Sequence, residues 1–154
     1  MRRVVFVLVA AVALVLGLTG PAYADSTTVA GVSDIKKMYV NNGVGAVVVK
    51  IYGAGGKCAI RYVAATVKGR DGTTYKATGG CYPGGTWIKG LEKGTKLVPC
   101  GDYKLSYNVT GKFWRFSIPR TCVPRLPDKI KVSGEMTQSA IPGEAGPTRL
   151  LARG

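Results

Sequence analysis

Residues 100 to 122 constrain the fold most tightly, because their side chains alternate between apolar and polar and two cysteines flank them. A period of two is typical of a β-strand with one buried face. We predict a β-hairpin whose two-residue turn is Gly111-Lys112, with glycine first as a type II′ turn requires. The predicted register places three apolar pairs on one face: Val109 with Trp114, Tyr107 with Phe116, and Leu105 with Ile118.

The first 24 residues have the three parts of a secretory signal peptide. Arg2 and Arg3 form a charged start, residues 4–18 are an apolar run, and Ala22-Tyr23-Ala24 is a cleavage site of the small-x-small type. The apolar run is shorter than the roughly 20 residues that span a bilayer, so we expect no membrane span after cleavage. We therefore predict that residues 1–24 are removed and that the protein is secreted and extracellular.

Four cysteines follow the predicted cleavage site: Cys58, Cys81, Cys100 and Cys122. An even number of cysteines in an exported chain indicates disulfides, although four cysteines allow three arrangements. We predict the pairs Cys58–Cys81 and Cys100–Cys122, because each pair flanks its own hairpin. The chain contains no histidine and no Cys-x-x-Cys motif, so we expect neither a metal site nor a cofactor.

Short segments with strand patterns follow one another from Asp34 onward, and no long helical period interrupts them. Asn42-Gly43 predicts a turn. In the strand after it, Val47, Val49 and Ile51 should line one face, with Val48, Lys50 and Tyr52 on the other. Besides the central hairpin, the predicted strands are residues 35–40, 44–52, 59–67, 73–78, 86–89, 95–98 and 129–136.

About seven to nine short strands in one chain favour a single antiparallel β-sandwich. We place this domain at residues 34–137. Residues 25–33 are predicted to be a polar lead-in, and residues 138–154, with Pro142, Gly143, Gly146 and Pro147, an irregular tail. We expect a monomer stapled by the two disulfides.

The charge of the chain indicates what it would contact outside the cytosol. Lys and Arg number 22 against 8 Asp and Glu, which gives a formal net charge of +14. Such a charge, with aromatic rings that can stack on a partner, favours an anionic polymer of the cell envelope or a carbohydrate, although it also serves solubility. The candidate binding residues are Tyr82, Trp87, Lys89, Lys93, Lys96, Lys112 and Arg115.

These residues have a second interpretation that needs no partner. Trp87 can cover the rim of the core, and lysines on strands can keep sheet edges from pairing with other chains. Nucleic acid would satisfy the same charges, but export makes it a less natural target.

An alternative function is a secreted inhibitor or antagonist that presents a rigid loop to a protein such as a protease. The loop from Gly79 to Trp87 is anchored by Cys81, and residues 120–125 are anchored by Cys122. Arg120 or Tyr82 would be the exposed contact. Polyanion binding should weaken steeply with salt, whereas a complex based on shape should not.

Residue types argue against an enzyme. The absence of histidine excludes Ser-His-Asp, Cys-His and histidine-zinc arrangements. The eight acidic residues are scattered and mostly adjoin turns, so no pattern brings two carboxylates together. We predict no catalytic residues and a binding module in place of an enzyme.

The segment from Phe116 to Cys122, Phe-Ser-Ile-Pro-Arg-Thr-Cys, resembles a family of small uncharacterised secreted actinobacterial β-sandwich proteins. The resemblance continues through Leu126-Pro127 and Ile130-Lys131-Val132. Residues 34–37 and 152–154 are also similar to the two ends of proteins of this family. It implies a sandwich fold, export and a bacterial source, and it implies no activity. Where many such proteins have an Asp-x-Asp-x-Asp run, this chain has residues 66–72 with the single acid Asp71, so a calcium site is not expected.

Overall fold

A computed structural model describes residues 24–53, 62–81, 85–138 and 142–154. Residues 1–23 of the predicted signal peptide, Cys58 and Tyr82 lie outside these residues. The described chain is all-β and antiparallel, with one short 3-10 turn, η1 (Arg120–Cys122). Its strands are β1 (Asp25–Val32), β2 (Ile35–Asn42), β3 (Ala46–Gly53), β4 (Tyr62–Gly69), β5 (Thr74–Cys81), β6 (Trp87–Lys93), β7 (Lys96–Leu97), β8 (Lys104–Asn108), β9 (Phe113–Pro119), β10 (Ile130–Thr137) and β11 (Gly143–Ala145).

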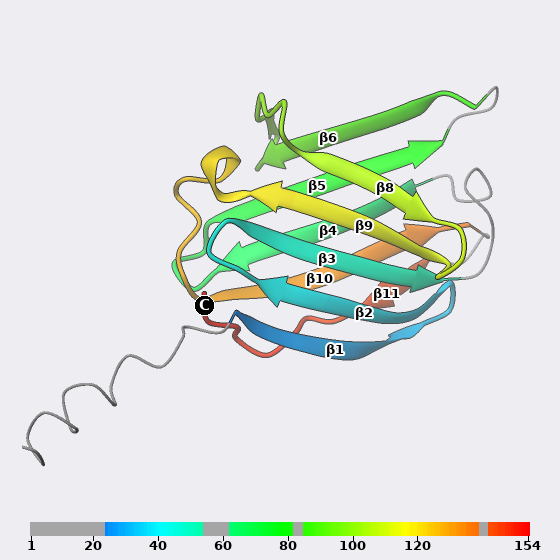
Figure 1. Ribbon diagram of the computed structural model, residues 1–154, viewed down its shortest axis with the longest axis horizontal. Coiled ribbons are helices and arrows are strands. Elements are labelled where there is room, and N and C mark those ends of the chain that lie inside the picture. Colours follow the sequence, from blue (N-terminus) through cyan, green and yellow to red (C-terminus); the bar gives the residue numbers. More distant parts are fainter. Residues whose placement is uncertain (1–23, 54–61, 82–84, 139–141) are drawn as a thin grey trace, which may run out of the picture.

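The eleven described strands form one sheet in the order β7-β6-β5-β4-β10-β11-β1-β2-β3-β9-β8. The sheet folds over on itself, so that β1, β2, β3, β9 and β8 make a front layer before β11, β10, β4, β5 and β6 (Figure 1). This arrangement is a half-barrel, and it corrects the predicted sandwich of two separate sheets. The two layers are continuous because β1 pairs with β2 through Asp25–Ala30 and with β11 through Gly31 and Val32.

The core fills the space between the two layers. Its largest fully buried side chains are Trp114 and Phe116 on β9. Val47, Val49 and Ile51 share one face of β3, as predicted, and this is the face that packs in the core, because none of the three has exposed surface. The back layer contributes a complementary set: Val63, Ala65, Val67, Tyr75, Ala77, Leu91, Ile130, Val132 and Met136.

Two segments predicted to lie outside the domain, the polar lead-in and the irregular tail, contain strands of the sheet. Residues 25–33 contain β1, and the tail contains β11 and a bridge between Ile130 and Leu151. Leu151 is fully buried. Sequence patterns miss these strands because β1 is only half-buried on its inner side and β11 has three residues, so backbone pairing holds them more than apolar side chains do.

In the central hairpin the apolar and polar side chains lie on the predicted faces, but the register between the two strands is shifted. Tyr107 pairs with Trp114, and Leu105 pairs with Phe116. The predicted register was therefore wrong by two residues. A shift of two keeps every side chain on its predicted face, since the period of a strand is two, and so the hydrophobic pattern alone does not choose between these registers.

The turn of this hairpin explains the shift. The last pair is Asn108 with Phe113, which leaves residues 109–112 as the loop. The carboxamide of Asn108 accepts a hydrogen bond from the Gly111 N–H at 2.5 Å. The residue with positive φ is Lys112 and not Gly111, so the predicted type II′ turn does not form. Val109 is left 73% exposed.

The Asn42-Gly43 hairpin also has a longer connection than predicted. Asn42 ends β2 and pairs with Val47, while the Gly43 N–H donates to the carbonyl of Ala46 at 3.1 Å. The remaining predicted strands agree with β4, β5, β6, β7 and β10 to within a few residues wherever they fall on the described chain.

The Cys100–Cys122 disulfide is confirmed, with the two Cα atoms 5.5 Å apart. It lies at the open end of the β8–β9 hairpin, as predicted. Cys81 is also disulfide-bonded, but its predicted partner Cys58 is outside the described residues. The second predicted pairing therefore stays a prediction.

Candidate functional site

The outward side chains of β2, β3, β9 and β8 lie in rows across the front layer. One row joins Tyr39, Lys50, Arg115 and Ser106, which are successive cross-strand partners. Two parallel rows flank it, and the three rows together, here called the front face, comprise Lys37, Tyr39, Asn41, Val48, Lys50, Tyr52, Lys104, Ser106, Asn108, Phe113, Arg115 and Ser117. Alternation along each strand places them opposite the buried core residues.

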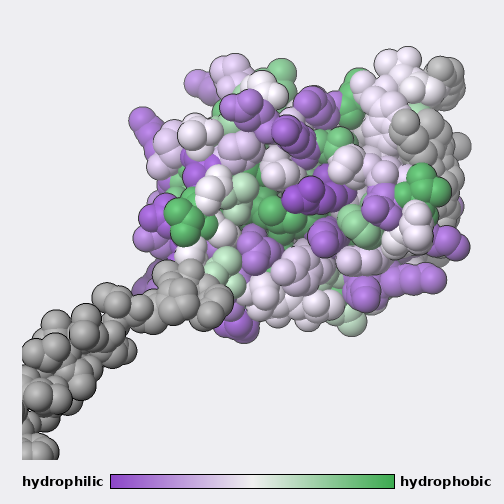
Figure 2. All heavy atoms as spheres, viewed as in Figure 1, coloured by the Kyte–Doolittle hydropathy of each residue, from purple (hydrophilic) through white to green (hydrophobic). Residues whose placement is uncertain are grey.

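The front face carries cations without acids. Its four charged residues are Lys37, Lys50, Lys104 and Arg115. The ion pairs of the described chain, Lys76–Glu135, Arg149–Asp25 and Arg153–Asp128, involve none of them. Viewed from this side, the surface shows hydrophilic side chains with small hydrophobic areas between them (Figure 2).

The back layer differs, because its outward positions carry both signs of charge. Glu92, Glu135 and Glu144 alternate with buried residues on β6, β10 and β11. The Lys76 ammonium lies 3.0 Å from the Glu135 carboxylate. Burial of Lys76 opposes its charge, but hydrogen bonds with Tyr62 and Glu135 outweigh burial and raise the pKa of Lys76. The outward positions of the front face thus carry positive charge alone, whereas those of the back layer carry both signs.

Aromatic rings lie against two of the front-face lysines, Lys37 and Lys50. The Lys50 ammonium lies 5.2 Å from the ring centre of Phe113 and 5.5 Å from that of Tyr39. Lys37 lies over Tyr52 at 4.7 Å. These distances are within the range of cation–π attraction, which positions the charges while leaving them solvent-accessible.

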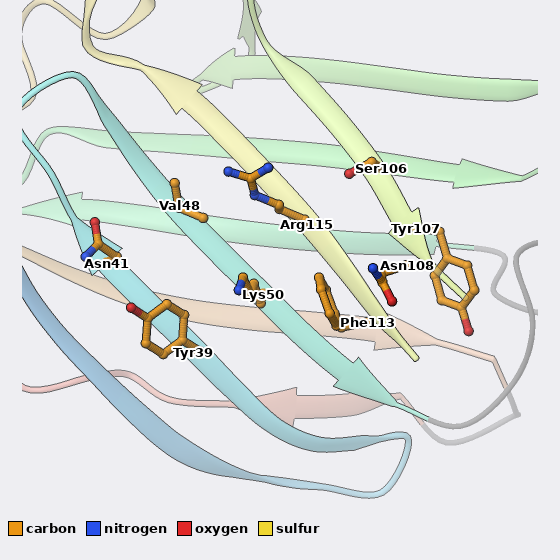
Figure 3. A pocket seen from close by; sticks show the side chains of 9 residues that line it. All are labelled: Tyr39, Asn41, Val48, Lys50, Ser106, Tyr107, Asn108, Phe113 and Arg115. Carbon is orange, nitrogen blue, oxygen red and sulfur yellow. The ribbon is translucent and has the colours of Figure 1, made fainter. Parts of the chain in front are cut away.

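Two adjacent pockets open on this layer. The first, of about 440 Å³, is lined by side chains from all four strands (Figure 3): Tyr39, Asn41, Val48, Lys50, Ser106, Tyr107, Asn108, Phe113 and Arg115. The second, of about 420 Å³, is lined by Lys89, Lys104, Leu105, Ser106, Arg115 and Ser117. Because Ser106 and Arg115 line both pockets, one extended ligand can occupy the two at once.

Lys89 joins the second pocket from the opposite layer. It lies on β6, and its ammonium donates a hydrogen bond to the carbonyl of Tyr103 at 2.7 Å. The Tyr103 hydroxyl in turn donates to the carbonyl of Thr78 at 3.1 Å, and burial raises the pKa of Tyr103 above its usual value. This chain of contacts fixes Lys89 across the open side of the half-barrel.

The predicted binding residues do not form one surface. Arg115 and Lys89 line the second pocket together, and Lys112 lies in the loop between β8 and β9. Lys93 and Lys96 are backbone partners where β6 pairs with β7. The Lys93 ammonium lies 5.8 Å from the ring centre of Tyr75.

Trp87 follows the alternative interpretation given above. It is half-buried against the core, and its ring centre lies 4.6 Å from that of Trp114. Its ring therefore covers the edge of the core, and this contact leaves less of it for a ligand. The other predicted aromatic, Tyr82, is not among the described residues.

Sequence reasoning missed Tyr39, Lys50 and Phe113, which surround the first pocket. The alternation of each strand already separates these residues from the buried ones. What the sequence lacked was the order of the strands, since β3 and β9 are neighbours in the sheet although more than sixty residues separate Lys50 from Arg115.

Arg120, the predicted contact residue of an inhibitor, directs its side chain to groups within the fold. Its guanidinium donates to the side chain of Asn42 and lies 3.4 Å from the carbonyls of Leu126 and Pro127. Burial lowers the pKa of Arg120 from its ordinary value. A side chain held this way does not extend toward a protease.

Within the described ranges, no group of three or more His, Cys, Asp or Glu side chains could hold a metal ion. Among the same residues, no helix is long and apolar enough to cross a membrane. No protein-family model matches the chain, and no curated protein matches it either. The site geometry is therefore the basis for assigning a function.

Proposed function

We propose that this protein is an exported, non-catalytic binding module that attaches to an anionic polymer of the cell envelope through its front face. The supporting observation is the segregation of charge: four cations, two of which lie over aromatic rings, are on a face whose twelve residues include no acid. Clustered charge of one sign attracts a polyanion and raises its local concentration. The two adjoining pockets give such a chain a place to lie.

A matched pair of variants tests the proposal. Lys50→Gln with Lys104→Gln removes two charges from the front face. Lys68→Gln with Lys131→Gln removes two from the back layer, where these lysines are exposed cross-strand partners. Net charge and residue type change equally in both, so only the position of the charge differs.

We expect the front-face variant to bind insoluble cell-wall material roughly tenfold more weakly at low salt, and the back-layer variant to bind like the parent protein. Retention of the parent should fall steeply as salt rises. Sedimentation with cell-wall material measures both. Equal losses in the two variants, or retention that ignores salt, would contradict the proposal, and the second result would favour a protein partner recognised by shape.

A further inference from the structure

The two pockets on the front layer differ in chemistry, and this difference indicates the repeating unit of the polymer. The second pocket collects Lys89, Lys104 and Arg115 from three strands, together with the hydroxyls of Ser106 and Ser117. None of its described lining residues is acidic. These residues therefore place hydrogen-bond donors from three strands around one pocket.

Such an arrangement suits a tetrahedral oxyanion better than a carboxylate. A carboxylate has two oxygens in one plane, which one guanidinium can satisfy in a bidentate manner. A phosphate or sulfate ester directs its oxygens out of any single plane, so it can accept from the Arg115 guanidinium, the Lys104 ammonium and a serine hydroxyl together.

The first pocket combines two cations, Lys50 and Arg115, with aromatic and amide groups that the second pocket lacks. The rings of Tyr39 and Phe113 stand on either side of Lys50, and Asn41 and Asn108 contribute carboxamides (Figure 3). Aromatic faces pack against the C–H groups of a sugar or polyol. A carboxamide both donates and accepts, which matches hydroxyl groups that do the same.

We propose that the ligand is a polymer whose repeating unit is a sugar or polyol carrying a phosphate or sulfate ester. The ester occupies the second pocket and the polyhydroxylated unit occupies the first. Arg115 and Ser106, which line both pockets, contact the junction between the two. This inference rests on the proposed function and specifies its ligand.

Four soluble polymers test the inference by titration calorimetry with the purified protein: poly(glycerol phosphate), dextran sulfate, inorganic polyphosphate and polygalacturonate. The first two combine a polyol or sugar with a tetrahedral ester, and comparing them separates phosphate from sulfate. Polyphosphate lacks the hydroxylated unit, and polygalacturonate has carboxylates in place of esters. We expect at least one of the first two to bind tenfold or more tightly than both of the others at equal ionic strength.

Variants of the individual pockets provide the second part of the test. Asn41→Ala should weaken binding of the preferred polymer several-fold and leave polyphosphate binding unchanged. Arg115→Gln should weaken both. Thermal unfolding and circular dichroism of each variant check that the fold is retained, and Lys131→Gln, on the opposite face, serves as the binding control.

The outcomes separate this inference from the proposed function. Polygalacturonate or polyphosphate bound as tightly as the preferred polymer would overturn the inference and leave a general polyanion-binding face. Binding of none of the four, by a protein that also fails to sediment with cell-wall material, would overturn both. An Asn41→Ala variant that loses polyphosphate and polyol-phosphate binding equally would also contradict the assignment of the first pocket.

Discussion

The buried side chain of Asn42 connects three parts of the chain that are remote in sequence. Its amide donates to the carbonyl of Asp128 at 2.9 Å and to that of Leu151 at 3.0 Å, and its oxygen accepts from the Arg120 guanidinium. The Gly154 N–H donates to its backbone carbonyl at 3.2 Å. The sequence predicted a turn residue here, whereas the fold uses Asn42 to fasten the C-terminal segment to the end of β2.

We expect Asn42→Ala to lower the free energy of unfolding by about 3 kcal/mol, because it leaves buried carbonyls and a half-buried guanidinium without their partner. Urea denaturation measures this change. Asn41→Ala, one residue earlier on the outer side of β2, is the matched control and should change stability little. Equal effects of the two substitutions would show that the buried hydrogen bonds contribute nothing specific.

Asp25, at the start of β1, also binds the C-terminal segment. Arg149 forms a salt bridge with its carboxylate at 2.5 Å, and the Ala152 N–H donates to it at 3.2 Å. Burial opposes ionisation of Asp25, but the hydrogen bonds from Arg149 and Ala152 and the charge of Arg149 outweigh burial and lower the pKa of Asp25 below 3.8.

This lowered pKa predicts a pH dependence of stability. The ionised carboxylate stabilises the fold, so its contribution is present above pH 3.8 and is lost as the pH falls through the lowered pKa. Asp25→Asn should therefore be less stable than the parent at pH 7, and the difference should vanish in stronger acid. Thermal unfolding over a pH series measures it. A difference that stayed constant down to pH 2 would rule out the carboxylate as its source.

At the scale of elements, the β8–β9 hairpin combines a buried inner side with a binding outer side. Trp114 and Phe116 are fully buried, while their neighbour Arg115 points to the two pockets. β8 is the last strand of the sheet and pairs only with β9 among the described strands. The Cys100–Cys122 disulfide therefore supports a strand that has a partner on one side alone.

We expect Cys100→Ser with Cys122→Ser to cost about 3 kcal/mol of stability, chiefly because the unfolded chain is no longer restricted across a separation of 22 residues. Denaturation of the parent and the double variant gives the value. Because β8 contributes Lys104 and Ser106 to the second pocket, polymer binding should weaken as well. Unchanged stability would mean that pairing with β9 and packing of Leu105 on Gly79 suffice to hold β8.

At the scale of the whole molecule, β11 links the two layers into one sheet. It pairs with β10 on one side and with β1 on the other, although it has only three residues. Gly143 is at its start, where the backbone of the β1–β2 turn passes close by. A β-carbon added at Gly143 would lie 2.6 Å from the backbone nitrogen of Ile35 and 2.8 Å from that of Asp34.

We therefore expect Gly143→Ala to destabilise the protein by about 2 kcal/mol, since backbone atoms on both sides must shift to admit the methyl group. Gly101→Ala is the control, because an added β-carbon there meets no atom within 4 Å. Denaturation midpoints compare the two variants. If both had the same small effect, the contact between β11 and the β1–β2 turn would be less tight than the geometry indicates.

The sequence by itself determined the properties that depend on neighbouring residues. Alternation predicted which side chains of β8 and β9 face the core, and the two cysteines that flank this hairpin predicted the Cys100–Cys122 bridge. The first follows from the period of two along a strand and the second from the positions of the cysteines beside the hairpin, and both are local in the sequence. For the same reason alternation left the hairpin register open to a shift of two residues, which the turn at residues 109–112 decided.

Only the tertiary structure decided which strands are neighbours, and with them the candidate site. Tyr39, Lys50, Arg115 and Ser106 form a row because β2, β3, β9 and β8 are adjacent in the sheet. These strands are adjacent because the core packs between the two layers and because β1 and β11 join the layers into one sheet. The side chains of β1 and β11 give little indication that these segments are strands. Backbone hydrogen bonds form with any side chain, so a strand held mainly by them carries no sequence pattern to reveal it.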